Sequence, residues 1–290
     1  MFKGSIPALI TPFKNGEVDY LSLSKIIEWS LKQGTHGFVP CGTTGESPTL
    51  SHSEHKKIIE ECVRIVDKRV PIIAGTGSNN TSEAIEYTNH AEKSGADAAL
   101  IVTPYYNKPT QDGLYAHFKK ISESTSLPII IYNIPSRSVV DMTISTMYEL
   151  SKIPNIVGVK DATNDLFRPL ISKTKITNEF CYLSGEDGTA LSFLAQGGNG
   201  CISVTANIAP KLCSDMQNLW MQKELNLAQE INLKLAKVHE VLFSETSPGP
   251  VKYAAELLNL CSSETRLPLV PIKDNTKKLI KERLFEAELI

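Results

Sequence analysis

The hydrophobic residues of this chain fall into short β-branched runs that alternate with longer stretches of helical spacing. Because strands buried on both faces of a parallel sheet are apolar throughout, these runs are expected to be such strands. In the stretches between them, apolar residues recur every three or four positions, which is typical of amphipathic helices. The eight predicted strands are residues 5–11, 37–41, 70–75, 98–103, 127–132, 155–162, 180–184 and 200–204.

Helix boundaries are marked by polar residues that can cap a first turn. Asp19 precedes a periodic stretch that Gly34 is expected to end. Ser51 followed by Glu54 has the spacing of a capping box, in which each side chain bonds the backbone of the other residue. Strand and helix therefore follow one another in regular order from the beginning of the chain.

Eight strand and helix repeats predict an α/β fold, specifically a (β/α)8 TIM barrel. A doubly wound open sheet is the alternative. The glycine-rich stretch 75–80 does not support it, because Asn80 stands where the dinucleotide-binding fingerprint needs its third glycine. We therefore favour the barrel.

The strand pattern ends before Pro210, and three helices are predicted after it, over residues 219–243, 251–260 and 276–287. A barrel of typical length, about 250 residues, does not need all of them. We expect a catalytic barrel domain over 1–224 and a C-terminal helical region over 225–290 that packs on the barrel.

Composition narrows the class of partner. Thirty Lys and Arg residues nearly balance 32 Asp and Glu residues, so the net charge of −2 gives no electrostatic footprint for nucleic acid or an anionic membrane. A small-molecule partner is expected. There is no C-x-x-C pair, no apolar run of membrane-spanning length and no signal-peptide pattern in residues 1–10, which favours reduced thiols, no metal site and a cytoplasmic protein. The six cysteines are Cys41, Cys62, Cys181, Cys201, Cys213 and Cys261.

Lys160 ends the predicted strand 155–162 and is the candidate nucleophile. In a barrel, the carboxyl ends of the strands form the catalytic face. Burial there favours the neutral amine of a lysine, and a neutral amine can attack a carbonyl to form a Schiff base. A structural lysine paired with a carboxylate is the alternative.

Other polar residues also follow predicted strands. Thr43 and Thr44, in a loop between glycines, could hold a carboxylate through hydroxyls and backbone amides. Tyr132 could move a proton, and Arg137 could bind a second carboxylate in bidentate fashion. Each alone would also fit an ordinary turn or packing residue, but their shared location beside Lys160 favours a site.

Three segments, 42–46, 132–137 and 158–161, together resemble the dihydrodipicolinate synthase family of class I, pyruvate-dependent aldolases. The resemblance implies condensation of pyruvate with L-aspartate-4-semialdehyde to 4-hydroxy-tetrahydrodipicolinate, the first committed step toward diaminopimelate and lysine, without a cofactor. In that family a neighbouring subunit supplies the tyrosine that matches Tyr106, so a homotetramer built from two dimers is expected. The implied catalytic residues are Lys160, Tyr132, Thr43 and Tyr106, and the implied substrate-binding residues are Thr44, Arg137, Gly185 and Ile202.

The resemblance also implies an allosteric site for L-lysine. Asn80 and Glu83, however, have the spacing of a helix cap, and His52 and His55 would also fit exposed positions at a helix start. The positions that match the lysine site of feedback-inhibited members are Ser47, Leu50, His52, His55, Asn79, Glu83 and Tyr105.

Two alternatives for function remain open on sequence alone. N-acetylneuraminate lyase and sugar-acid aldolases keep the lysine and the Y-x-x-P segment but bind polyhydroxylated substrates. A catalytically silent barrel that senses a metabolite would be a protein of another class. The Thr43–Thr44 pair and Arg137 favour the dihydrodipicolinate assignment.

Overall fold

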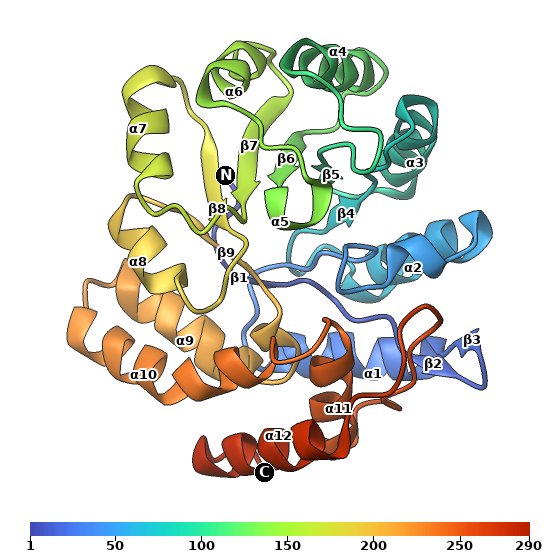
Figure 1. The fold of residues 1–290 in the computed structure, drawn as a ribbon, viewed down its shortest axis with the longest axis vertical. Helices are drawn as coiled ribbons and strands as arrows, with labels where there is room; N and C mark the ends of the chain where they lie inside the picture. Colours follow the sequence, from blue (N-terminus) through green and yellow to red (C-terminus); the bar gives the residue numbers. More distant parts are fainter.

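Seven parallel strands form one sheet at the centre of the computed structural model, which describes residues 1–290 (Figure 1). The strand order is β1-β9-β8-β7-β6-β5-β4, as expected for consecutive β/α units. All seven coincide with predicted strands, although each is shorter than its prediction. Their bounds are β1 Gly4–Pro7, β4 Ile73–Gly75, β5 Ala98–Val102, β6 Ile129–Asn133, β7 Ile156–Asp161, β8 Cys181–Ser184 and β9 Gly200–Ser203.

The second predicted strand, 37–41, is reduced to two parallel bridges that close the barrel. Ala8 pairs with Val39, and Phe38 pairs with Ile72, so this segment joins the β1 edge of the sheet to the β4 edge. Pro40 has no backbone N–H to extend the ladder, which is the physical reason for its shortness. The (β/α)8 prediction is confirmed, with one of the eight strands present as bridges.

Helices surround the strands in Figure 1 and begin where the sequence predicted caps. The Asp19 side chain accepts hydrogen bonds from the backbone of the first turn of α1, and Ser51 and Glu54 form the complete capping box of α2. A short α5 (Pro135–Ser138) follows β6. The ring consists of α1 Tyr20–Lys32, α2 His52–Val66, α3 Thr81–Ser94, α4 Gln111–Ser122, α6 Ile144–Ser151, α7 Arg168–Lys175, α8 Ala190–Ala195 and α9 Pro210–Met221.

Three further helices, α10 (Leu225–Val241), α11 (Gly249–Leu257) and α12 (Asp274–Glu286), form the C-terminal region. α10 packs on α9 and α12, and α11 packs on α12. The sequence predicted one helix over residues 219–243 and so did not separate α9 from α10. In the structure, α9 already begins at Pro210, and a turn over residues 222–224 separates it from α10. The division of domains at residue 224 stays a prediction.

The core has two layers, inside and outside the sheet. Thirteen buried residues fill the interior of the barrel, among them Ile6, Leu100, Tyr132 and Ile202. A larger cluster of 55 buried residues lies between the sheet, the surrounding helices and the C-terminal helices. Alternate side chains of each strand thus face the two layers, and the interior layer carries side chains to the carboxyl ends of the strands.

Candidate active site

Lys160 and Tyr132 lie side by side at the carboxyl ends of β7 and β6. The two residues are register partners in the parallel ladder, and Lys160 Nζ lies 4.1 Å from the centroid of the Tyr132 ring. Both residues are only 6% exposed. A buried primary amine beside a phenol is an arrangement that can form an imine and move the protons that imine formation requires.

Asn133 and Asp161, which follow Tyr132 and Lys160 in the ladder, belong to a polar network that the sequence did not predict. The Asp161 carboxylate accepts hydrogen bonds from the backbone and hydroxyl of Thr163 and lies 3.4 Å from Arg168 Nε. Arg168 also donates to Asp141, which in turn accepts from the Asn133 amide. Burial raises the pKa of Asp161, while the hydrogen bonds from Thr163 and the charge of Arg168 oppose the rise. The only sequence signal was a polar residue at the end of each strand.

Gly185 lies close to Lys160, whereas Ile202 lies in the interior of the barrel, and the substrate-binding roles that the resemblance implied for both stay predictions. A Cβ atom on Gly185 would lie 2.7 Å from Ala162 Cβ and 3.1 Å from Lys160 Cε, so no larger residue fits without displacing its neighbours. Ile202 is buried in the interior cluster of the barrel that also contains Tyr132. Gly185 therefore restricts where the Lys160 side chain can lie.

The Thr43–Thr44 loop packs against the segment that follows β1. The Thr11 hydroxyl donates to the Gly45 carbonyl at 2.7 Å, and a Cβ on Gly45 would come within 3.0 Å of the Leu9 carbonyl. Thr44 is buried, whereas Thr43 is half-buried. A glycine at position 45 thus permits the close approach that fixes the two threonines.

Thr43 and Arg137 line one cavity of about 200 Å³. Arg137 lies on α5 with its side chain exposed, and no carboxylate of the chain pairs with it. A free guanidinium at the mouth of a cavity can receive the carboxylate of a small molecule. The cavity is lined by Thr43, Ser47, Pro48, Gly77, Val102, Tyr105, Ile134, Arg137 and Ser138.

Tyr106 is not brought into this cavity. Its side chain is 90% exposed, and its backbone has a φ of 71°, in the left-handed region. Neighbouring Tyr105 lines the cavity instead, and its carbonyl accepts hydrogen bonds from Asn79 and Asn107. The catalytic role of Tyr106 stays a prediction that requires a second copy of the chain.

Several residues of the expected lysine site lie together beside the same cavity. Glu83 pairs with His52 at 3.1 Å and accepts a hydrogen bond from the Ser78 hydroxyl. Glu83 therefore does not close a capping box with Asn80, although Asn80 does cap α3 through Ser82 N. Ser47 and Tyr105 line the cavity, and Leu50 is buried at the end of the same loop.

His55 is not exposed at the helix start, as one alternative held, because it is buried against the ring of Tyr87 with a centroid distance of 4.0 Å. Burial lowers the pKa of His55 to about 4, although a backbone hydrogen bond with Gly75 acts in the opposite direction. His55 is therefore a neutral, stacked residue at neutral pH.

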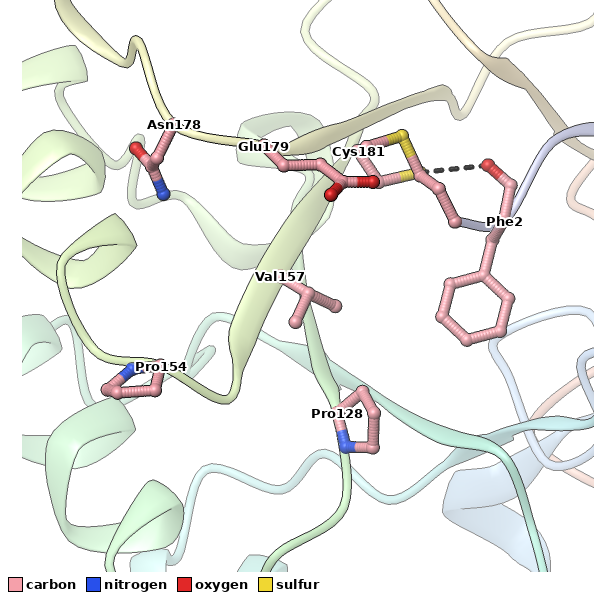
Figure 2. A pocket seen from close by; sticks show the side chains of 8 residues that line it. Phe2, Pro128, Pro154, Val157, Asn178, Glu179 and Cys181 are labelled. Atoms are coloured by element: carbon pink, nitrogen blue, oxygen red, sulfur yellow. Dashed lines mark hydrogen bonds between the residues drawn. The ribbon is translucent and has the colours of Figure 1, made fainter.

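A larger cavity, of about 550 Å³, lies at the opposite, amino-terminal end of the strands (Figure 2). Its lining includes Phe2, Pro128 and Pro154, and the Cys181 thiol there donates to the Phe2 carbonyl. Burial raises the pKa of Cys181 to about 12, so this thiol is not a nucleophile at neutral pH. This cavity therefore lies at the end of the strands opposite to Lys160 and Tyr132, and it offers no reactive nucleophile.

No three His, Cys, Asp or Glu side chains lie close enough together to hold a metal ion. No helix combines the length and the apolar character needed to cross a membrane.

Comparison with known proteins agrees with this geometry. The profile of the dihydrodipicolinate synthetase family matches residues 1–287. The 4-hydroxy-tetrahydrodipicolinate synthase of Rhodospirillum centenum is 57% identical over the full length of both chains. The dihydrodipicolinate synthase of Acinetobacter baumannii, solved in complex with pyruvate, is 47% identical with a TM-score of 0.98, and the Cyanidioschyzon merolae enzyme, solved with lysine bound, is 35% identical with a TM-score of 0.96. These structures cover all of this chain and at least 99% of their own.

Proposed function

Because the chain belongs to the dihydrodipicolinate synthetase family, we propose that its reaction runs through a Schiff base between Lys160 and pyruvate. The reaction itself is the condensation of pyruvate with L-aspartate-4-semialdehyde to 4-hydroxy-tetrahydrodipicolinate, and the chain is a lyase of lysine biosynthesis. The observation that carries the proposal is the enclosed Lys160 amine beside the Tyr132 ring at the end of β7.

The chemistry begins with attack of the neutral Lys160 amine on the keto carbon of pyruvate. The carbinolamine that results must lose its hydroxyl as water, and Tyr132 supplies the proton for that step. The iminium then withdraws electrons from the adjacent methyl group, which loses a proton to give an enamine. The enamine carbon attacks the aldehyde of the second substrate.

The other residues of the site bind carboxylates and relay protons. Thr44, with Thr43, holds the carboxylate of pyruvate, and Arg137 receives the carboxylate of the semialdehyde. Thr43 links Tyr132 to Tyr106 of a neighbouring copy in the proton relay. The exposure of Tyr106 supports this role, since no residue of its own chain covers it.

The assembly and regulation of the enzyme follow from the same proposal. A homotetramer of two dimers, working in the cytoplasm, would bring Tyr106 of one copy to the site of another. L-lysine would bind beside the cavity through the His52–Glu83 pair, and the relative solved with lysine bound supports a site for this effector.

The proposal is tested by trapping pyruvate on the enzyme with borohydride and mapping the adduct by peptide mass. The wild type is expected to carry a reduced adduct on Lys160 and to turn over the semialdehyde. Lys160→Ala is expected to carry none, while Lys152→Ala, at an exposed lysine after α6, keeps the adduct. An adduct on another lysine, or no adduct with full turnover, would contradict the proposal.

A further inference from the structure

A buried ion pair joins the C-terminal helical region to the loop that carries the two threonines. Lys252 Nζ, on α11, lies 2.7 Å from Glu46 Oε1, and the exposures of the two side chains are 0% and 1%. The residues are 206 positions apart in sequence. Because removing a charge from water is costly in free energy, such a pair exists only where its geometry and partners compensate that cost.

Each charged atom of this pair has a further partner. Glu46 Oε2 accepts a hydrogen bond from the backbone N–H of Arg266 at 3.0 Å. Lys252 Nζ lies 4.2 Å from the centroid of the Phe13 ring, and the Arg266 guanidinium lies 4.4 Å from the same ring. The Arg266 side chain in turn forms an ion pair with Glu54 of α2. Glu46 is thus held from the C-terminal region at both of its carboxylate oxygens.

Glu46 also determines the shape of the threonine loop. Its backbone N–H donates to the Thr43 carbonyl at 3.1 Å, so Glu46 closes the turn that presents Thr43 and Thr44. Its φ of 55° is in the left-handed region, which is strained for a residue with a Cβ and persists only when the surroundings enforce it. The enforcing contacts are those of its side chain with Lys252 and Arg266.

We propose that Glu46 and Lys252 are positioning residues that hold Thr43 and Thr44 in place for the carboxylate of pyruvate. This inference rests on the proposed function, in which the two threonines bind that carboxylate. The C-terminal helical region thereby takes part in substrate binding although none of its residues lines the cavity. Loss of the pair lets the turn relax, and the affinity for pyruvate falls.

The experiment separates positioning from stability by comparing single and double substitutions. In Lys252→Met, the Glu46 carboxylate remains buried without its partner, so both thermal stability and pyruvate binding are expected to fall. In Glu46→Leu/Lys252→Met, apolar residues replace both charges and stability is expected to recover toward that of the wild type. The KM for pyruvate is expected to stay about tenfold or more above the wild-type value in both variants, because small displacements of binding groups are costly.

Two further variants serve as a control for stability and as a test that does not depend on the double variant. Ile280→Val, in the buried face of α12, lowers stability without touching the loop and is expected to keep the wild-type KM. Glu46→Gln preserves shape but removes the charge, and its KM for pyruvate is expected to rise at least about threefold even if the double variant does not fold. A wild-type KM in Glu46→Gln, or in a folded double variant, overturns the inference. Borohydride trapping of pyruvate on the wild type is measured alongside, so that failure of the Schiff-base proposal is recognised separately.

Discussion

The amine of Lys160 lies over the face of the Tyr132 ring, and the two residues are direct partners across β7 and β6. Their relative position is therefore fixed by the hydrogen-bonded ladder of the sheet and not by a loop. In the proposed mechanism, the ring face would also stabilise the positive charge of the iminium formed on Lys160. Positions on strands hold reacting groups more accurately than positions on loops, as the proposed attack by the Lys160 amine would require.

Replacing Tyr132 by Phe tests whether the phenol moves protons. The ring, its packing and its contact with the Lys160 amine are kept, while the hydroxyl is lost. Turnover is expected to fall by about 10²- to 10⁴-fold, the usual contribution of a positioned acid or base. Steady-state rates and the rate of pyruvate trapping check this, with circular dichroism as a control for folding. Unchanged turnover would remove Tyr132 from the relay.

Replacing Gly185 by Ala is expected to disturb Lys160 directly. The added Cβ would lie 2.7 Å from Ala162 Cβ and 3.1 Å from Lys160 Cε, so the lysine side chain must shift. Overpacking of this kind costs about 1–3 kcal/mol, and kcat/KM for pyruvate is expected to fall by about tenfold or more.

Gly188→Ala is the matched control for this substitution. A Cβ there meets no atom within 4 Å, and the residue lies in the same segment after β8. Wild-type kinetics are expected. If both glycine variants lose activity equally, the loss does not come from contact with Lys160.

The sequence predicted the barrel well because its strands are buried on both faces and its helices are amphipathic, so burial alone determines the pattern. The sequence analysis overlooked one short element, although its turn signal is clear. The hairpin of β2 (Phe13–Lys14) and β3 (Glu17–Val18) turns at Asn15–Gly16, an Asn-Gly pair with positive φ at both residues that is a strong hairpin signal.

The candidate site was predicted less completely than the fold. Tyr132 and Lys160 lie at the carboxyl ends of strands, and Thr43 and Arg137 follow strands, so the barrel prediction placed all four on one face. The Glu46–Lys252 pair could not be predicted, because its residues are 206 positions apart and nothing local marks them as partners. Long-range ion pairs depend on the tertiary arrangement, which hydrophobic periodicity does not encode.

Tyr106→Phe is expected to lower turnover without changing the fold. The side chain is 90% exposed in one chain, so removing its hydroxyl breaks no contact within that chain. A loss of activity would therefore indicate a role in the site of a neighbouring copy. Turnover, the thermal midpoint and the molecular mass in solution should be measured together, and full activity in a folded Tyr106→Phe variant would contradict the relay.

L-lysine at millimolar concentration is expected to lower the initial rate, because the proposed effector would bind through Glu83 beside the cavity. Glu83→Gln removes the charge that pairs with His52, and the lysine concentration for half inhibition is expected to rise about tenfold or more. Glu86→Gln is the control, since Glu86 lies on the same helix but pairs with Lys56. Equal inhibition of both variants, or no inhibition of the wild type, would exclude this site.

Acid is expected to destabilise the fold through His55. Burial lowers the pKa of this residue to about 4, whereas the same residue in an unfolded chain has a pKa near 6.5. Between these values the unfolded chain binds more protons than the folded one, so stability is complete above about pH 6.5 and is lost as the pH falls toward 4. Between pH 7.5 and pH 5, His55 is expected to lower the unfolding free energy by about 2 kcal/mol.

His55→Phe keeps the stack on Tyr87 but cannot bind a proton. Between pH 7.5 and pH 5, its unfolding free energy is therefore expected to fall by about 2 kcal/mol less than that of the wild type. Urea unfolding at pH 7.5 and pH 5 measures the difference. A pH dependence in His55→Phe equal to that of the wild type would show that the buried histidine is protonated without cost, for example because local opening of α2 admits water.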